Sequence, residues 1–546
     1  MQFLQENPII PLFLLVLIAT ALHNLFTISG AKKKAEKKAR EAFGQIPKKR
    51  EVKDYIRDYH QYVTEAEGAT SAVDAITWQD LNMDDVFARI NTCASSVGEE
   101  YLYHLLHELC FDKKELAQRD RLIYRMEEND TDRLRLQNAL LSIGRKQGGL
   151  SFYLFHAATK RLKNAWTYTV RALLPFLGIP IAFVNPVYGG TFLIVAGLAN
   201  VVTYYRRRLN LDMEMETMQQ FSAFLYAARK IEAERGDMLR EFGLDLKKPL
   251  AVFKRMGGFI PGRARSMMME LEEITVFFRA VFLWDFIKYN HTIEHLDRYQ
   301  AEVREIFRVV GEADSAISVA SFRQSLPYYC KPVFQKENAV IFTELLHPLL
   351  EHPVSNSGHI DNDVIITGSN ASGKSTFIKT VAVNHILAQT IHTCTARAYA
   401  LRPSYVCSSM AIKDDILAGE SYFIAEIKSL KRVIAYAKQR PCICLIDEIL
   451  RGTNTPERIA ASTAVLRALH ETDSLCLIAS HDIELTDILK DLYDNYHFRE
   501  SFIDGEITFD YQLHEGPSTT TNAIKLLAYM GFEKEIVAEA ARRVKS

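Results

Sequence analysis

The stretch that most restricts the fold of this chain is DVIITGSNASGKST, residues 363–376. The β-branched residues Val364 to Thr367 predict a buried strand, and they lead directly into the pattern Gly-x-x-x-x-Gly-Lys-Ser. Glycines in such a loop let backbone N–H groups face phosphate oxygens, and the following helix adds its positive N-terminal end. Strand, loop and helix in this order predict an α/β domain that binds a nucleotide.

The loop also supplies most of the candidate binding side chains. Lys374 places a point charge at the β- and γ-phosphates, and the Ser375 hydroxyl can ligate Mg²⁺. ATP and Mg²⁺ are therefore the expected ligands. The predicted loop residues are Gly368, Ser369, Asn370, Ala371, Ser372, Gly373, Lys374, Ser375 and Thr376.

Two later apolar runs end in residues that can carry chemistry. CICLIDEI (442–449) predicts a central parallel strand with Asp447 and Glu448 at its carboxyl end, and SLCLIAS (474–480) predicts a strand followed by His481. We expect Asp447 to hold Mg²⁺, directly or through water, and Glu448 to polarise the attacking water. His481 is expected beside the γ-phosphate. The predicted catalytic residues are Lys374, Glu448 and His481.

An uncharged run near the N-terminus, residues 7–31, is long enough to cross the hydrocarbon core of a membrane. The basic segment KKKAEKKAR (32–40) follows it, and the positive-inside rule places that segment in the cytoplasm. A secretory signal peptide is the alternative. The residues before the run include Glu6 but no Lys or Arg, which favours a membrane anchor.

A second uncharged run lies between Arg171 and Arg206 and is too long for one crossing. The turn-forming residues NPVYGG (185–190) interrupt it, and basic residues flank both ends. These features predict a transmembrane hairpin, with a buried hairpin in a soluble core as the alternative. Together with the anchor this gives about three spans in the cell membrane, with the later sequence in the cytoplasm.

The formal net charge of −1 gives no overall basic field of the kind that marks many nucleic-acid-binding proteins. A local patch is still present, because the stretch from Lys247 to Arg265 contains basic residues and no acidic ones. This stretch could contact phosphates of DNA or of anionic lipid, or be a solvated loop.

Several segments together resemble, in the same order, the motifs of the MutS-type ATPases of the ABC superclass. DLNMDDVFARINTCASSVGEEYLYHLL (80–106) is similar to the start of the family's helical core. The ATPase motifs are TGSNASGKST (367–376), DDILAGESYFIAEI (414–427), LIDEILRGTNT (445–455), ASHDIELT (479–486) and GPSTTTNAIKLLAYMGF (516–532). Leu450 departs from the pattern, because the family usually has glycine there.

The resemblance implies a homodimer with composite ATP sites. Ser421 would reach the partner's γ-phosphate, Asn356 would lie near the nucleotide, and RGTNT (451–455) would lie at the dimer interface. Helices from about residue 522 would serve dimerisation. The family also implies binding of double-stranded DNA, but residues before 80 leave no room for a mismatch-recognition domain, so mismatch specificity is not expected. A lipid or protein partner without any DNA role is the alternative.

The expected fold class is an α/β P-loop ATPase domain of the ABC/MutS type, preceded by an all-α core and lever domain and carrying transmembrane helices. The predicted domains are a transmembrane anchor (1–31), a charged cytosolic linker (32–78), the first part of the helical core (79–165), a transmembrane hairpin (166–207), lever helices with the return of the core (208–335), and the ATPase domain with C-terminal dimerisation helices (336–546).

Overall fold

The computed structural model describes residues 30, 34, 36–48, 52–68, 73–145, 150–155, 161–208, 211–254, 276–369, 372–410, 422–503, 506–518 and 530–545. Several predictions lie outside these residues. They concern nearly all of the N-terminal anchor, the loop residues Asn370 and Ala371, the dimer-site residue Ser421, the basic stretch beyond Lys254, and most of the segment 516–532.

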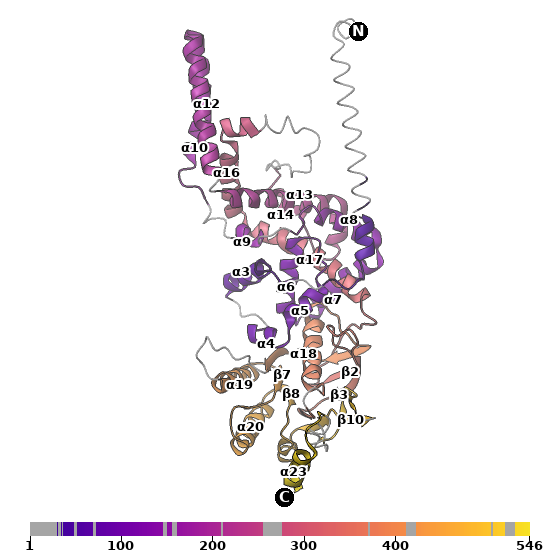
Figure 1. The fold of residues 1–546 in the computed structure, drawn as a ribbon. Helices are drawn as coiled ribbons and strands as arrows, with labels where there is room; N and C mark the ends of the chain where they lie inside the picture. The colour runs from indigo at the N-terminus through magenta and orange to yellow at the C-terminus, as the bar shows by residue number, and fades with distance from the viewer. Residues whose placement is uncertain are drawn as a thin grey trace.

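The described part of the chain is elongated, and its two ends differ in kind (Figure 1). A pair of apolar helical arms, including α12 (Pro186–Arg208), projects from one end. The α/β domain forms the other end, and a layer of helices separates the two. The nucleotide motifs and the apolar arms are therefore far apart in the molecule.

The helical middle is formed by segments from both sides of the apolar arms. α6 (Ser96–His107) packs along α17 (Gln300–Gln324), and Gly311 of α17 lets the two helices approach, since a Cβ there would lie 2.5 Å from that of Tyr101. The remaining helices are η1 (Asp54–Arg57), α3 (Asp58–Glu67), α4 (Ala75–Asp80), α5 (Met83–Ile90), α7 (Lys113–Glu128), α8 (Asp130–Leu140), α9 (Leu150–Phe155), α13 (Asp212–Arg240), α14 (Lys247–Ala251) and α16 (Trp284–Arg298).

The start of α6 shows how α17 fixes the chain. Ser95 caps α6, because its hydroxyl accepts a hydrogen bond from Gly98 N. Asp314 of α17 accepts hydrogen bonds from Ser95 N, Ser95 Oγ and Ala94 N at 2.6–2.9 Å. Burial raises the pKa of Asp314 to about 6, although these hydrogen bonds oppose that rise. This buried cap joins two helices that are distant in the sequence.

The apolar arms are built from α10 (Trp166–Leu173), η3 (Leu174–Leu177) and α11 (Gly178–Val184) on one side and α12 on the other. Among the described residues, the stretches Trp166–Val184 and Pro186–Arg208 have the length and hydropathy of helices that cross a membrane. Asn185 makes the turn, with its side-chain oxygen accepting from Val187 N and Tyr188 N.

The glycine pair of NPVYGG does not form the turn, contrary to the sequence-based expectation. Gly189 and Gly190 lie inside α12. A Cβ at Gly189 would lie 2.3 Å from the backbone nitrogen of Ala182, so this glycine is needed where α12 crosses α11. Small residues at a helix crossing let two backbones approach closely. The pattern that suggests a turn in a soluble protein is here a packing site.

The α/β domain is built on a six-stranded sheet in the order β12-β9-β4-β8-β7-β6. The strands from β9 to β6 pair in parallel, and only β12 is antiparallel to its neighbour. The strands are β4 (Val364–Thr367), β6 (Tyr405–Ser409), β7 (Cys442–Asp447), β8 (Ser474–Ala479), β9 (Asp494–His497) and β12 (His514–Glu515). A smaller sheet, β1-β5-β2-β3, contains β1 (Val333–Phe334), β2 (Val340–Leu345), β3 (Asn356–Ile360) and β5 (Ala398–Leu401).

Helices cover both faces of the large sheet, as expected for buried parallel strands. Val364 and Ile366 of β4 face the core that contains α18 (Lys374–Thr390), while Ile365 faces the core of α19 (Tyr422–Gln439) and α20 (Thr455–His470). The hairpin of β10 (Glu500–Ile503) and β11 (Glu506–Phe509), then α21 (Glu484–Ile488) and α23 (Lys534–Lys545), complete the described elements.

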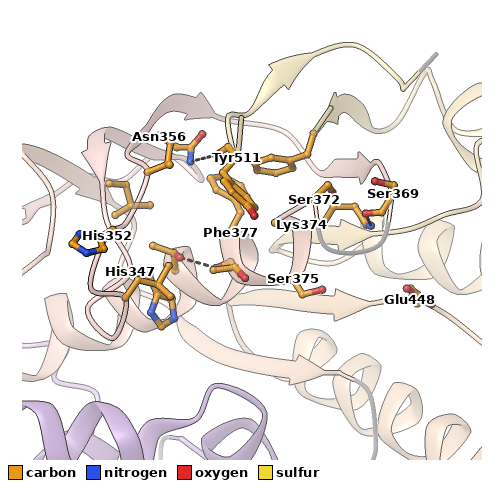
Figure 2. A pocket seen from close by; sticks show the side chains of 17 residues that line it. His347, His352, Asn356, Ser369, Ser372, Lys374, Ser375, Phe377, Glu448 and Tyr511 are labelled. Carbon is orange, nitrogen blue, oxygen red and sulfur yellow. Dashed lines mark hydrogen bonds between the residues drawn. The ribbon is translucent and has the colours of Figure 1, made fainter. Parts of the chain in front are cut away.

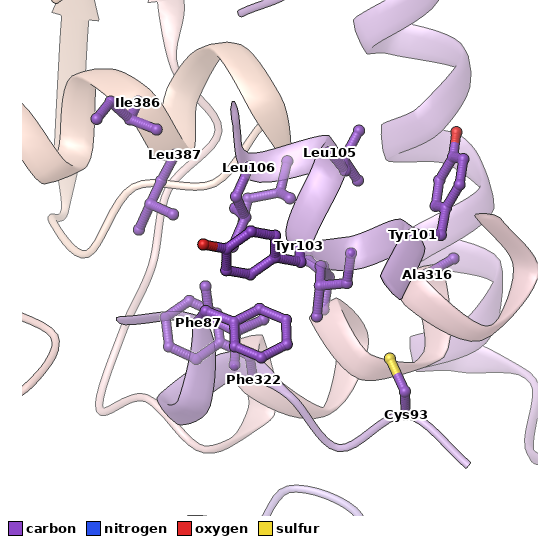
Figure 3. Close-up of a cluster of buried hydrophobic side chains, with 14 of the residues drawn as sticks. Phe87, Cys93, Tyr101, Tyr103, Leu105, Leu106, Ala316, Phe322, Ile386 and Leu387 are labelled. Atoms are coloured by element: carbon purple, nitrogen blue, oxygen red, sulfur yellow. The ribbon is translucent and has the colours of Figure 1, made fainter. Parts of the chain in front are cut away.

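The α/β domain and the helical middle share one hydrophobic core. Leu387 of α18 lies near Leu106 of α6, and Ile386, Leu105 and Phe87 belong to the same cluster (Figure 3). α18 therefore belongs to both parts of the molecule: its first residue is in the predicted nucleotide loop, and its last turns pack against the helical middle.

Candidate nucleotide-binding site

The sheet order brings the predicted motifs together. β8 lies between β4 and β7, so the loop after β4, the carboxylates at the end of β7 and the histidine after β8 share one edge of the sheet. Ile366 of β4 and Asp447 of β7 both pair with Ala479. In parallel sheets ligands bind outside the carboxyl ends of the strands, and this is the edge where the motifs meet.

Glycine geometry shapes the loop around the first residue of α18. Gly368 and Gly373 have φ values of 141° and 108°, which L residues rarely adopt. A Cβ at Gly368 would also lie 2.6 Å from Phe498 O. Ser369 hydrogen bonds to the carboxylate of Glu500 on β10. The glycines are therefore required by the path of the backbone, as the motif predicts.

Lys374 lies inside this loop and is almost fully buried. Its Nζ donates hydrogen bonds to Gly368 O at 2.8 Å and to Ser369 O at 2.9 Å, and it lies 3.4 Å from Nε2 of His481. Burial lowers the pKa of Lys374 to about 8, while the charges of Glu448 and Asp447 oppose that shift. The ammonium is thus a partly desolvated cation, which attracts anions strongly.

Glu448 is held on two sides. His481 Nε2 lies 3.0 Å from its carboxylate, and Arg451 forms an ion pair with it. Burial would raise the pKa of Glu448, but the hydrogen bond with His481 and the charge of Arg451 outweigh it, so the pKa is lowered. Its backbone has a φ of 60°, a strained conformation of the kind found at functional sites. The side chain is therefore an oriented, ionised carboxylate.

The ion pair between Arg451 and Glu448 was not predicted from the sequence. The resemblance assigns RGTNT (451–455) to a dimer interface, whereas within one chain Arg451 pairs with Glu448 and Asn454 caps α20 by accepting from Glu457 N at 3.1 Å. Gly452 lies against the ring of Phe423, where a Cβ would be 3.0 Å from the ring. An arginine three residues after Glu448 is the signal that was available.

The residues present fit a magnesium ion. Oδ1 of Asp447 and Oγ of Ser372 are buried and have no hydrogen-bond partner among the described residues. Ser375 lines the same cavity as Glu448 and Lys374. A carboxylate and a serine hydroxyl are hard oxygen ligands of the kind that Mg²⁺ prefers next to substrate phosphates. Asp447 is not among the residues that line this cavity with Ser375, so their joint role at Mg²⁺ stays a prediction.

A cavity of about 410 Å³ continues from the loop toward β3 (Figure 2). Gly373, Lys374, Ser375 and Thr376 line it, together with Asn356 at the start of β3. Asn356 Nδ2 donates to Tyr511 O at 3.0 Å, and its Oδ1 accepts from Leu513 N at 2.8 Å. The predicted residue Asn356 therefore lies at the cavity and shapes its wall.

Several cavity residues were not found from the sequence. They are His347, His352, Phe377, Phe498 and Tyr511, which come from separate segments of the chain. Tyr511 has a φ of 53° and its ring lies 3.2 Å from the position of a Cβ on Gly373. No motif marks these residues, because only the folded chain brings them to the loop.

Comparison with known proteins agrees with this architecture. Residues 364–546 match the family model of MutS domain V. This part of the chain is therefore similar to MutS proteins. It is similar to the DNA mismatch repair protein MutS of Geobacillus sp. (strain WCH70), at 29% identity over 245 residues, which is 42% of this chain and 28% of that protein.

Two further MutS relatives match a similar stretch. A Thermus thermophilus protein is 29% identical over 255 residues, covering 44% of this chain and 30% of the relative. A Listeria monocytogenes protein is 26% identical over 268 residues, covering 46% of this chain and 31% of the relative. Both carry the name DNA mismatch repair protein MutS. The matched part thus spans less than a third of the length of these MutS proteins.

Proposed function

We propose that this chain belongs to the MutS family and is a Mg²⁺-dependent ATPase held in a membrane, which works as a homodimer and uses ATP to move its helical middle. One observation carries the enzymatic part. Lys374, His481 and Glu448, from three neighbouring strand ends, form a contact chain in which His481 Nε2 lies 3.4 Å from Lys374 Nζ and 3.0 Å from Glu448.

Each of these residues has a role in phosphoryl transfer, where catalysis consists mostly of positioning and charge stabilisation. The ammonium of Lys374 offsets phosphate charge. Glu448, ionised because of His481 and Arg451, orients the attacking water and accepts its proton. His481 holds Glu448 in place and faces the γ-phosphate. Ser375 and Asp447 would hold Mg²⁺, which supplies charge neutralisation at the phosphates.

The homodimer belongs to the proposal through the resemblance to MutS-type ATPases. In that arrangement Ser421 completes the partner's site and the segment after residue 522 contributes to the interface. Arg451 is then a link between the two sites, because it already pairs with Glu448 within one chain.

Exposure of the apolar arms supports insertion in a membrane over burial in a soluble core. Phe183 and Val184, at the tip, are 88% and 89% exposed. A group of large apolar side chains with this degree of exposure is typical of a surface that contacts lipid or a protein partner. With the uncharged run 7–31 as an anchor, the proposal places about three spans in the cell membrane and the ATPase domain in the cytoplasm.

Polar contacts gather at the base of the arms instead. Tyr204 of α12 donates to Oδ2 of Asp285 of α16 at 2.7 Å, and Arg279 donates to Oδ1 of the same carboxylate from Nη2 at 2.5 Å and from Nε at 2.8 Å. Asn200 donates to Arg171 O and Val281 O. These contacts join the arms firmly to the helical middle, so movement of that layer would reach the proposed membrane segments.

A second set of contacts joins α18 to the same layer at its far end. Arg119 of α7 donates to Thr390 O at 2.7 Å, and Arg323 of α17 donates to Thr393 Oγ1 at 2.9 Å. Arg323 is fully buried and also pairs with Asp120 at 2.7 Å. Events at the loop can therefore be passed through α18 to α7 and α17.

Two kinds of partner could be the target of this motion: DNA, or a lipid or protein. DNA is favoured by the names of the relatives, which are DNA mismatch repair proteins. A lipid or protein partner is favoured by the exposed apolar arms. Mismatch specificity is not part of the proposal, because the matched part of the chain covers less than a third of the relatives.

The test is ATP hydrolysis by the full-length protein in lipid nanodiscs, with Lys374→Ala as the blank. Homoduplex and mismatched DNA are each added at low and moderate salt, because contacts to phosphates weaken as salt rises. Hydrolysis above the blank supports the ATPase, and stimulation by DNA that fades with salt supports the DNA candidate. Hydrolysis unaffected by any DNA favours the lipid or protein candidate. Wild-type activity equal to the blank would refute the ATPase.

A further inference from the structure

A second cluster of potential ligands lies in the helical middle, away from the nucleotide cavity. His60 of α3, His104 of α6 and Glu108, which ends α6, each offer one ligand atom, and the three atoms lie within 4.8 Å of one another. The Nδ1 atoms of His60 and His104 are 3.1 Å apart. All three residues are partly buried. The geometry points to a zinc site that clips α3 onto α6.

The donor set and spacing suit this ion. Zn²⁺ binds imidazole nitrogens at about 2.0–2.1 Å in a tetrahedral arrangement, so two nitrogens on one ion lie roughly 3.3 Å apart. The observed separation of 3.1 Å is close to that value. Two imidazoles and one carboxylate form a set of three protein ligands that leaves one position for water. Glu108 is the C-cap residue that directly follows α6, and its carboxylate lies within 4.8 Å of the ligand atoms of His60 and His104.

The surrounding aromatic residues hold both rings in place. His60 stacks on His107 at 4.1 Å between centroids, and His107 stacks on Trp78 at 3.5 Å. His104 meets the ring of Tyr59 edge-on at 5.2 Å. Rings fixed by packing are preorganised for a ligand, which reduces the entropy lost on binding.

The electrostatic environment agrees with this geometry. Burial lowers the pKa of His60 to about 4 and, together with the charges of His60 and Arg119, lowers the pKa of His104 to about 3. Both rings are then neutral at neutral pH, the form in which imidazole binds metals. A single N–H···N hydrogen bond between the two rings is the competing explanation for their contact, and it requires neither a metal nor Glu108.

The site would join the segment before the core to the core itself. Ile56 of η1 and Tyr59 of α3 are buried in the main cluster, and α3 packs on α6. α6 in turn packs against α17 and α18. A zinc ion at His60, His104 and Glu108 would therefore fix α3 to the helices that lead to the nucleotide loop.

Metal content of the full-length protein tests the inference. The protein is purified in nanodiscs with its affinity tag removed, equilibrated with buffered Zn²⁺, dialysed and analysed by mass spectrometry. We expect about one zinc ion per chain in the wild type and in Lys374→Ala, which shows independence from the ATPase site. His60→Gln and His104→Gln should each lose at least tenfold in zinc affinity, and Glu108→Gln should lose less.

His291→Gln is the matched control, because it removes an exposed histidine of α16 outside the cluster. Wild-type protein with Co²⁺ in place of Zn²⁺ should show the visible absorption of a tetrahedral ion, and Zn²⁺ should raise the Tm by several degrees, reversibly with chelator. These wild-type readouts do not depend on folding of the variants. Zinc content equal in wild type and His104→Gln, or no zinc and no Tm shift in the wild type, would leave only the hydrogen-bonded histidine pair and overturn the inference.

Discussion

The two ends of this molecule differ in the side chains that they bury and expose, and in the evidence from which their roles are inferred. At the nucleotide end, charged groups are buried and paired: Lys374 lies beside His481, and Glu448 lies between His481 and Arg451. At the other end, the arms around Phe183 and Val184 expose apolar side chains, and their contacts with α16, such as that of Tyr204 with Asp285, lie at the base. The role of the nucleotide end is inferred from its sequence motifs. The role of the other end is inferred only from the apolar side chains that it exposes.

This difference shows that an ATPase motif indicates how ATP would be used, but does not identify the partner on which the protein acts. Burial and pairing restrict which residues can occupy the nucleotide end, and residues 364–546 match a family model. Apart from contact positions such as Gly189 and Asn200, exposed apolar helices are restricted mainly by length and hydropathy. The following predictions test whether the two ends are indeed independent in chemistry and connected through the middle.

The largest effect is expected at the nucleotide end. Glu448→Gln removes the ionised carboxylate but keeps its shape, so we expect kcat to fall by about 100-fold or more while ATP still binds. Steady-state hydrolysis and equilibrium nucleotide binding measure the two quantities. Glu471→Gln, at an exposed position after α20, is the control and should be without effect. Retention of most activity in Glu448→Gln would show that another group activates the water.

The connection through the middle is tested by Arg323→Ala. Its removal takes away the fully buried partner of Asp120, which keeps Lys331 at 2.8 Å, so we expect a loss of about 3 kcal/mol of unfolding free energy, the lower end of the range for breaking a buried pair. Denaturant unfolding of the protein in detergent measures the loss. Arg402→Ala breaks the more exposed pair with Asp473 and should cost less than about 1 kcal/mol. Equal losses in the two variants would contradict the assigned role of Arg323.

The apolar end has its own sensitive position at Asn200. Asn200→Leu removes the side-chain donor that Arg171 O and Val281 O share, which should cost about 1 kcal/mol, because Arg171 O still accepts from Leu174 N. Thermal unfolding in detergent gives the measurement, with hydrolysis by folded protein expected to change little. Thr191→Val, at an exposed site of α12 with only a local hydrogen bond to Val187 O, is the matched control. An Asn200→Leu variant as stable as the control would show that the base of the arms is not held by this side chain.

The smallest effect concerns the pH dependence of ATP binding. The pKa of Lys374 is about 8 because of burial, so its ammonium is charged below that pH and increasingly neutral above it. Binding of phosphate above pH 8 must then take up a proton, and affinity should fall by up to about tenfold per pH unit. Calorimetric titration between pH 7 and 9.5 measures this slope. Lys374→Met should lack it, and a flat wild-type profile would contradict the desolvated lysine.

The sequence predicts the parts of the fold that local patterns determine. The expected strands appear as β4, β7 and β8, and their ends bring Lys374, Glu448 and His481 together. The pairing of Arg451 with Glu448 was not predicted, because a motif gives spacing but not side-chain direction. Tyr511 was not predicted either, since its place at the cavity depends on the path of a distant segment.

Two local patterns were less informative than they looked. The glycines of NPVYGG indicate a turn by composition, yet Gly189 is required by the helix crossing. Leu450 replaces the family's usual glycine and nevertheless has a φ of 58°. Its side chain is buried in the core of α19 and α20, and that burial offsets the cost of the left-handed backbone. Tertiary packing decides both cases, and a single sequence does not contain it.

The length of α18 has a mechanical consequence. Its 17 residues make a rod of about 26 Å, with Lys374 at one tip and the hydrogen bond from Arg119 to Thr390 O at the other. A rod pivoting at the nucleotide tip by about 5° would carry its far tip about 2 Å sideways, the scale on which packed helices slip from one arrangement to another. A small tilt of α18 at the loop is therefore large enough to displace the helices of the helical middle, which hold the base of the apolar arms.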